Sequence, residues 1–149
     1  MADYKEALQA GFAAAKKAEI ARKEVEEILG KFKADLLAAS DGKLLVEIRE
    51  FEEDESHYER MVRTSMVFGS PPQPKKTFKV LIATNPKATK PVISQLAVWK
   101  QAKDGYPCSL IWNKQERQCE DGVALEEGLA ELLKDPRVGE RLYSLMQQK

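Results

Sequence analysis

The sequence predicts an α+β protein in which a long N-terminal helix precedes a small domain of strands and helices. Over the first forty residues an apolar side chain recurs every three or four positions, which is the period of one helix face. Runs that alternate apolar and polar residues follow, and the last third of the chain returns to helical spacing. We therefore expect residues 1–40 to form a long helix that serves oligomerisation, and residues 41–149 to form a single α+β domain.

The N-terminal helix has recognisable ends. Asp3 is a good N-cap, and Glu6 stands where it completes a capping box. Ser40, Asp41 and Gly42 supply the turn that ends the helix. At about 1.5 Å per residue the helix is roughly 50 Å long, which is more than a domain of this size needs. A second copy of the chain is a natural cover for the excess apolar stripe.

The two halves of this helix differ in side-chain size. The Val25–Leu37 half carries bulky residues and is expected to dock on the core of the domain. The Leu8–Ala21 half carries a narrow alanine stripe that allows close approach of another helix. We expect a coiled-coil-like homodimer of undetermined orientation. Its predicted interface consists of Leu8, Phe12, Ala15, Ala18 and Ala21.

Three strand-like runs follow the helix and predict an antiparallel three-stranded meander. They are Lys43–Glu52, Tyr58–Phe68 and Thr77–Thr84, of which the last is the most apolar and is expected to be the most buried. The connection over residues 69–76 is rich in proline and is expected to be extended.

The segment Val92–Lys103 fits two patterns. Val92, Leu96 and Trp99 have helical spacing, and Pro91 suits a first helical turn. The same run also alternates as a strand. We predict a middle helix and keep the strand as the alternative.

The C-terminal third predicts a short second hairpin and two helices. Tyr106–Trp112 and Gln115–Cys119 flank a turn at Asn113-Lys114. One helix is expected over Val123–Leu133, and a last one is expected to begin at Asp135-Pro136 and to end at Met146. These are the C-terminal helices of the predicted fold.

The charges are strongly segregated, although the net charge is zero. Residues 1–70 carry 11 basic and 15 acidic residues, and residues 104–149 carry 6 basic and 9 acidic residues. Residues 71–103 contain no acidic residue. Their seven lysines are Lys75, Lys76, Lys79, Lys87, Lys90, Lys100 and Lys103.

This lysine segment is a candidate anion-binding or nucleic-acid-binding face. Phe78 and Trp99 lie among the lysines, as in proteins that bind phosphates and stack on bases. Against that, no arginine occurs between Arg63 and Arg117, and both aromatic residues also fit core positions. Pairing with acidic regions of a partner protein, or of a second copy, is the alternative.

The sequence offers little catalytic chemistry. Its single histidine, His57, follows an acidic run over residues 50–55 that lacks the glycine and spacing of a calcium-binding loop. Phosphate-loop, dinucleotide, nucleophile-elbow and metalloprotease motifs do not occur. We predict no catalytic residue, no cofactor and no metal site.

The two cysteines are predicted to face each other. If the hairpin turns on Asn113-Lys114, Cys108 and Cys119 become direct cross-strand neighbours. Two buried reduced thiols are the favoured interpretation, and a redox-sensitive bridge is the alternative.

These features predict a non-catalytic interaction protein that forms a small homo-oligomer and binds another protein. A nucleic-acid-binding accessory protein that uses residues 71–103 is the alternative. The N-terminus lacks a signal-peptide pattern, and no apolar run approaches the ~20 residues of a membrane span. We therefore expect a cytoplasmic protein that does not bind membranes.

Overall fold

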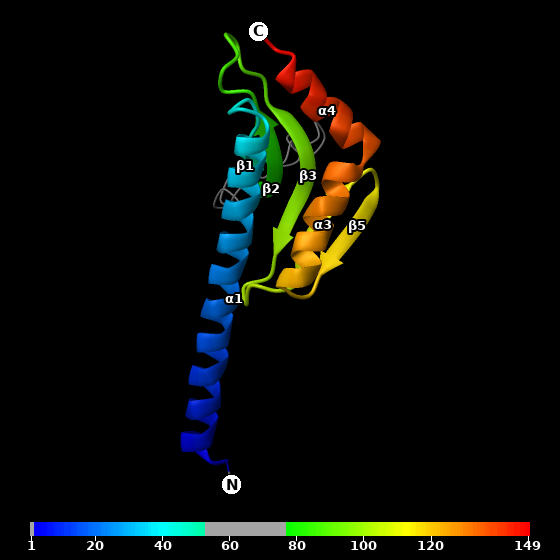
Figure 1. The fold of residues 1–149 in the computed structure, drawn as a ribbon. Helices are drawn as coiled ribbons and strands as arrows, with labels where there is room; N and C mark the ends of the chain where they lie inside the picture. Colours follow the sequence, from blue (N-terminus) through cyan, green and yellow to red (C-terminus); the bar gives the residue numbers. More distant parts are fainter. Residues whose placement is uncertain (1, 53–76) are drawn as a thin grey trace, which may run out of the picture.

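The computed structural model describes residues 2–52 and 77–149, in which a long helix runs along one side of a small α+β body (Figure 1). The elements of these residues are α1 (Tyr4–Ala39), β1 (Leu45–Glu52), β2 (Thr77–Thr84), β3 (Ser94–Gln101), β4 (Cys108–Trp112), β5 (Gln115–Cys119), α3 (Gly122–Lys134) and α4 (Pro136–Met146).

The five strands of the described residues form one antiparallel sheet in the order β1-β2-β3-β4-β5. The predicted α+β class is confirmed, but the division into a three-stranded meander and a separate hairpin is wrong. β3 lies between β2 and β4 and joins the hairpin to the rest of the sheet. β1 pairs directly with β2, and the predicted strand Tyr58–Phe68 lies outside the described residues.

The predicted middle helix over Val92–Lys103 is also wrong, because this segment forms β3. Leu81 pairs with Ala97 and Ile82 pairs with Gln95, so Leu96 is the extra residue of a β-bulge. The bulge shifts the alternation by one position, and Leu96, Ala97 and Trp99 all join the core. Core residues three apart therefore imitate helical spacing. Pairing with β2 on one side and β4 on the other stabilises the strand conformation of this segment, and the local sequence pattern does not reveal these partners.

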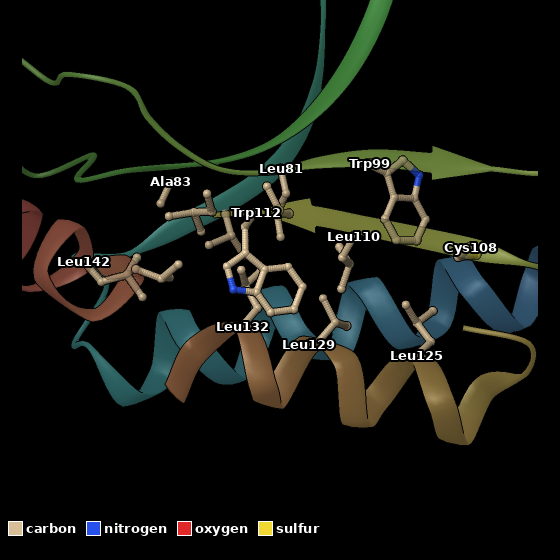
Figure 2. Close-up of a cluster of buried hydrophobic side chains, with 14 of the residues drawn as sticks. Leu81, Ala83, Trp99, Cys108, Leu110, Trp112, Leu125, Leu129, Leu132 and Leu142 are labelled. Carbon is tan, nitrogen blue, oxygen red and sulfur yellow. The ribbon is translucent and has the colours of Figure 1, made fainter. Parts of the chain in front are cut away.

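Both α3 and α4 and the second half of α1 cover one face of the sheet. Val25 of α1 lies in the same core as Leu129 and Leu132 of α3. Figure 2 shows Leu110 and Trp112 of β4 pointing toward α3, so the core fills the space between the sheet and the helices. The end of β2 is buried on both faces, as its apolar composition predicts.

Asp135 holds the α3–α4 junction to the hairpin. Its carboxylate accepts hydrogen bonds from the backbone N–H groups of Arg137 (2.9 Å) and Val138 (3.3 Å), which caps α4. It also accepts from Asn113 Nδ2 (2.8 Å) and Trp112 Nε1 (3.3 Å). Burial opposes ionisation, but these hydrogen bonds outweigh it and lower the pKa of Asp135.

The loop after β3 holds α1 on the body. Arg22 Nη1 donates a hydrogen bond to the Lys103 carbonyl oxygen (2.7 Å), and the Tyr106 hydroxyl donates to Glu24 Oε1 (2.7 Å). Burial and the Glu24 carboxylate raise the pKa of Tyr106, so the phenol stays protonated and remains a donor.

Gly105 allows the backbones of this loop and of α1 to touch. Its φ is +97°, which side chains other than glycine rarely adopt, and a Cβ atom there would lie 2.7 Å from Ala21 Cβ. The same Cβ would lie 2.9 Å from the Ala21 carbonyl carbon. The contact therefore depends on a glycine in the loop and an alanine in the helix.

Gly105→Ala is expected to lower the free energy of unfolding by about 1–3 kcal/mol, because it adds backbone strain and a clash with Ala21. Urea denaturation measures the change. Gly30→Ala is the matched control, since Gly30 is helical and exposed, and a Cβ atom added to it would meet no described atom within 4 Å. The control is expected to raise stability by up to ~1 kcal/mol. Equal effects of the two variants would contradict this account of the contact.

Candidate protein-interaction surface

The N-terminal half of α1 projects beyond the body (Figure 1). Its large apolar side chains are exposed: Tyr4 by 82%, Leu8 by 57% and Phe12 by 66%. Ala18 is the first buried residue of the helix, and Val25 is the next. We call residues 4–17 the free half of α1.

Small and apolar residues cover most of the circumference of the free half. At about 100° per residue, eight such residues from positions 4–15 occupy a continuous sector of roughly 200°. The sector consists of Ala10, Ala14, Ala7, Gly11, Tyr4, Ala15, Leu8 and Phe12, all exposed. A sector of this width is typical of a helix that is covered by another element.

The five residues predicted for an oligomer interface separate into two groups. Leu8, Phe12 and Ala15 lie on the free half and are exposed. Ala18 is buried, and Ala21 is half-buried against the Gly105 loop of the same chain. The stripe is therefore continuous, but its second part is already covered. Tyr4 and Gly11 belong to the exposed part as well, although the sequence prediction left both out.

No contact in the described part of the chain explains a glycine at position 11. Gly11 lies in a helix and is exposed, and a Cβ atom there would meet no described atom within 4 Å. Glycine at such a position costs about 1 kcal/mol of helix stability relative to alanine. Close approach of a second backbone is a common use of glycine on a helix surface.

The large apolar residues that the body exposes are scattered over several elements. Among the described residues they are Phe78, Val92, Ile93, Val123 and Tyr143. Single exposed side chains of this kind are normal on protein surfaces. They form a weaker case for a binding surface than the free half of α1.

The lysines of the candidate nucleic-acid face lie at two ends of the sheet. Lys79 is near the start of β2, whereas Lys87 and Lys90 follow its end, more than about 16 Å further along the strand. Lys100 is beside Lys79 but points to the opposite face, because Lys79 pairs with its neighbour Trp99. Lys103 lies in the loop that holds α1. Lys75 and Lys76 lie outside the described residues.

The aromatic residues of this segment have partners within the chain. Trp99 is buried in the core, and Phe78 packs against Phe51 with ring centroids 6.1 Å apart. The ammonium group of Lys87 donates to the Asp41 carbonyl oxygen (2.6 Å). None of these observations favours nucleic-acid binding, which stays a prediction.

A shallow pocket of about 300 Å³ lies between the β4–β5 hairpin and α3. The guanidinium group of Arg117, which lines this pocket, lies 3.6 Å from a carboxylate oxygen of Glu127 and 3.6 Å from one of Glu131. Lys134 and Asp135 complete a lining of mixed charge. Because the lining carries charges of both signs, it gives no reason to expect a ligand of one particular charge.

The structure describes no metal centre or membrane span. In residues 2–52 and 77–149, no three His, Cys, Asp or Glu side chains are grouped so as to hold a metal ion. His57 and the second half of the acidic run lie outside these ranges. No helix in the described part of the chain is long and apolar enough to cross a membrane.

The two cysteines are cross-strand partners in the β4–β5 hairpin. Cys108 pairs with Cys119 in the strand register, and both carry free, buried thiols. Asn113 and Lys114 have positive φ values and form the two-residue turn that sets this register. Burial, with a smaller contribution from Cys119, raises the pKa of Cys108 to about 12, and burial also raises the pKa of Cys119. Both thiols are therefore protonated and poorly nucleophilic at neutral pH.

At pH 8 both thiols are expected to react slowly with a disulfide reagent such as dithionitrobenzoate, because little thiolate forms and the sulfur atoms are buried. After unfolding in guanidinium, the two thiols per chain are expected to react at once. Fewer than two reactive thiols in the unfolded, unreduced protein would demonstrate the disulfide bridge instead.

The chain matches no protein-family model, no curated protein and no solved structure.

Proposed function

We propose that the protein is a non-catalytic interaction protein that acts as a homodimer through the free half of α1 and presents its α+β body to another protein. The observation that carries this proposal is the exposure of Tyr4, Leu8 and Phe12 on a half of the helix that the described part of the body leaves uncovered.

Helix energetics support a partner for the free half. An isolated helix of about 14 residues is marginal in water, because nucleation is unfavourable and propagation adds little per residue. Docking of the second half on the core overcomes nucleation, but packing of the apolar sector is what would stabilise the free turns. Burial of a leucine or phenylalanine side chain contributes about 1.5–3 kcal/mol.

The described titratable groups support a non-catalytic role. Each group with a shifted pKa takes part in a contact that stabilises the fold. The Tyr106 hydroxyl donates a hydrogen bond to Glu24, Cys108 faces Cys119 across the hairpin, and Asp135 caps α4. Their pKa shifts follow from burial and from these fold contacts. A dimer would carry two copies of the body and thus two copies of any surface that the body offers to another protein.

The wild-type protein is expected to have a solution mass near twice 16.8 kDa at tens of micromolar, measured by light scattering after size exclusion. Replacement of Leu8 and Phe12 together by Glu is expected to raise the dimer dissociation constant at least about 100-fold, because four buried apolar side chains become charged. The variant should then elute as a monomer.

Ile20→Glu is the matched control. Ile20 is a 58% exposed apolar residue of the same helix, but it lies about 120° around the axis from Leu8. It should leave the dimer intact, and circular dichroism should show unchanged helix content in all variants. A wild-type mass of one chain would refute the proposal. Equal loss of the dimer in the control would show that the effect is not specific to the apolar sector.

A further inference from the structure

We infer that two copies pair antiparallel through their free halves, with the two helices closest at Gly11. This inference rests on the proposed homodimer and adds its orientation and register. It follows from where the body covers α1, from the sizes of the exposed side chains and from the position of Gly11.

The body blocks a parallel partner. The apolar stripe of the free half continues through Ala18 and Ala21 to Val25, where the body of the same chain covers it. A parallel helix that follows this stripe would meet the Gly105 loop after the free half and could not continue. Each parallel partner would also bring its own body to the same place.

An antiparallel partner needs only the free half. Residues 4–17 extend about 20 Å along the helix axis. Two segments of this length overlap almost completely when they run in opposite directions, and the two bodies then lie at opposite ends of the pair. Figure 1 shows that the described elements of the body lie beside the other end of α1, away from the free half.

Large residues then lie opposite small ones. If the helices are closest at Gly11, the numbers of facing residues sum to 22. Leu8 faces Ala14 with Ala15 beside it, and Tyr4 reaches the level of Ala18, where the covered part of the stripe begins. Gly11 faces Gly11 of the partner, which allows the two backbones to approach closely. Large side chains that fill the space above small ones are the usual means of close packing between helices.

The exposed apolar area sets an upper limit on the contact. Tyr4, Leu8 and Phe12 together expose roughly 400 Å² per copy, given 150–250 Å² for a whole aromatic side chain. With the neighbouring alanines, complete coverage of the sector in both copies would bury about 1,000 Å², which is the lower bound for a specific interface.

Single cysteines introduced into the full chain test the orientation by oxidative cross-linking. Gly11→Cys is expected to form a covalent dimer with itself on a non-reducing gel. Ala7→Cys and Ala15→Cys should each fail alone, because equivalent residues lie about 12 Å apart along the axis. A mixture of the two should cross-link, since residues 7 and 15 face each other. The native thiols are buried and react slowly, and Ile20→Cys on the other side of the helix is the negative control.

Light scattering of each reduced variant separates the two proposals. A dimer mass with efficient self-cross-linking of both Ala7→Cys and Ala15→Cys would mean a parallel pair, which overturns the inference but keeps the homodimer. A dimer mass without cross-links at residues 7, 11 and 15 would place the interface elsewhere and also overturn the inference. A monomer mass for every variant and for the wild type would overturn both proposals.

Discussion

The contact between Ala21 of α1 and Gly105 determines how the rest of the molecule is arranged. Gly105 has a positive φ and lets the loop after β3 touch the helix backbone, while Arg22 and Glu24 add hydrogen bonds to the same loop. On one side of this contact, α1 belongs to the core through Val25. On the other side, the same apolar stripe faces solvent. A single helix thus serves as part of the core and as a candidate interface.

The body provides a rigid base for the helix. Its five described strands lie in the sheet in the order of the chain, and each pairs with the described strand next to it in sequence. The helices α3 and α4 and the docked half of α1 share one face of that sheet. Because the docked half is fixed by this core, the direction in which the free half projects is also fixed. A dimer formed through it would hold two bodies at a defined separation.

Features that depend on neighbouring residues could be predicted from the sequence. The N-cap Asp3, the turn at Asn113-Lys114 and the cap of α4 at Asp135 each follow from short patterns. The facing position of Cys108 and Cys119 follows from that turn by counting. By contrast, the strand β3 depends on partners that come earlier and later in the chain, and its bulge at Leu96 hides the alternation. Contact of Ala21 with a loop far along the chain leaves no local signal either.

The lysine segment shows that a cluster of charges in the sequence does not by itself predict a charged surface. Its residues are close in sequence, but β2 is extended, so Lys79 near its start and Lys90 after its end lie at opposite ends of the strand. Charge density along a chain becomes charge density on a surface only when the chain stays on one side of the fold. For the apolar stripe of α1, regular spacing in the sequence does place the residues on one surface, because residues three or four apart lie on the same face of a helix.

Amide hydrogen exchange at several protein concentrations tests most directly whether the free half of α1 is covered by a second copy. The account predicts that protection of residues 4–17 rises with protein concentration, while protection of the docked residues 25–36 stays constant. Protection of residues 4–17 that is the same from nanomolar to high micromolar concentration would contradict it.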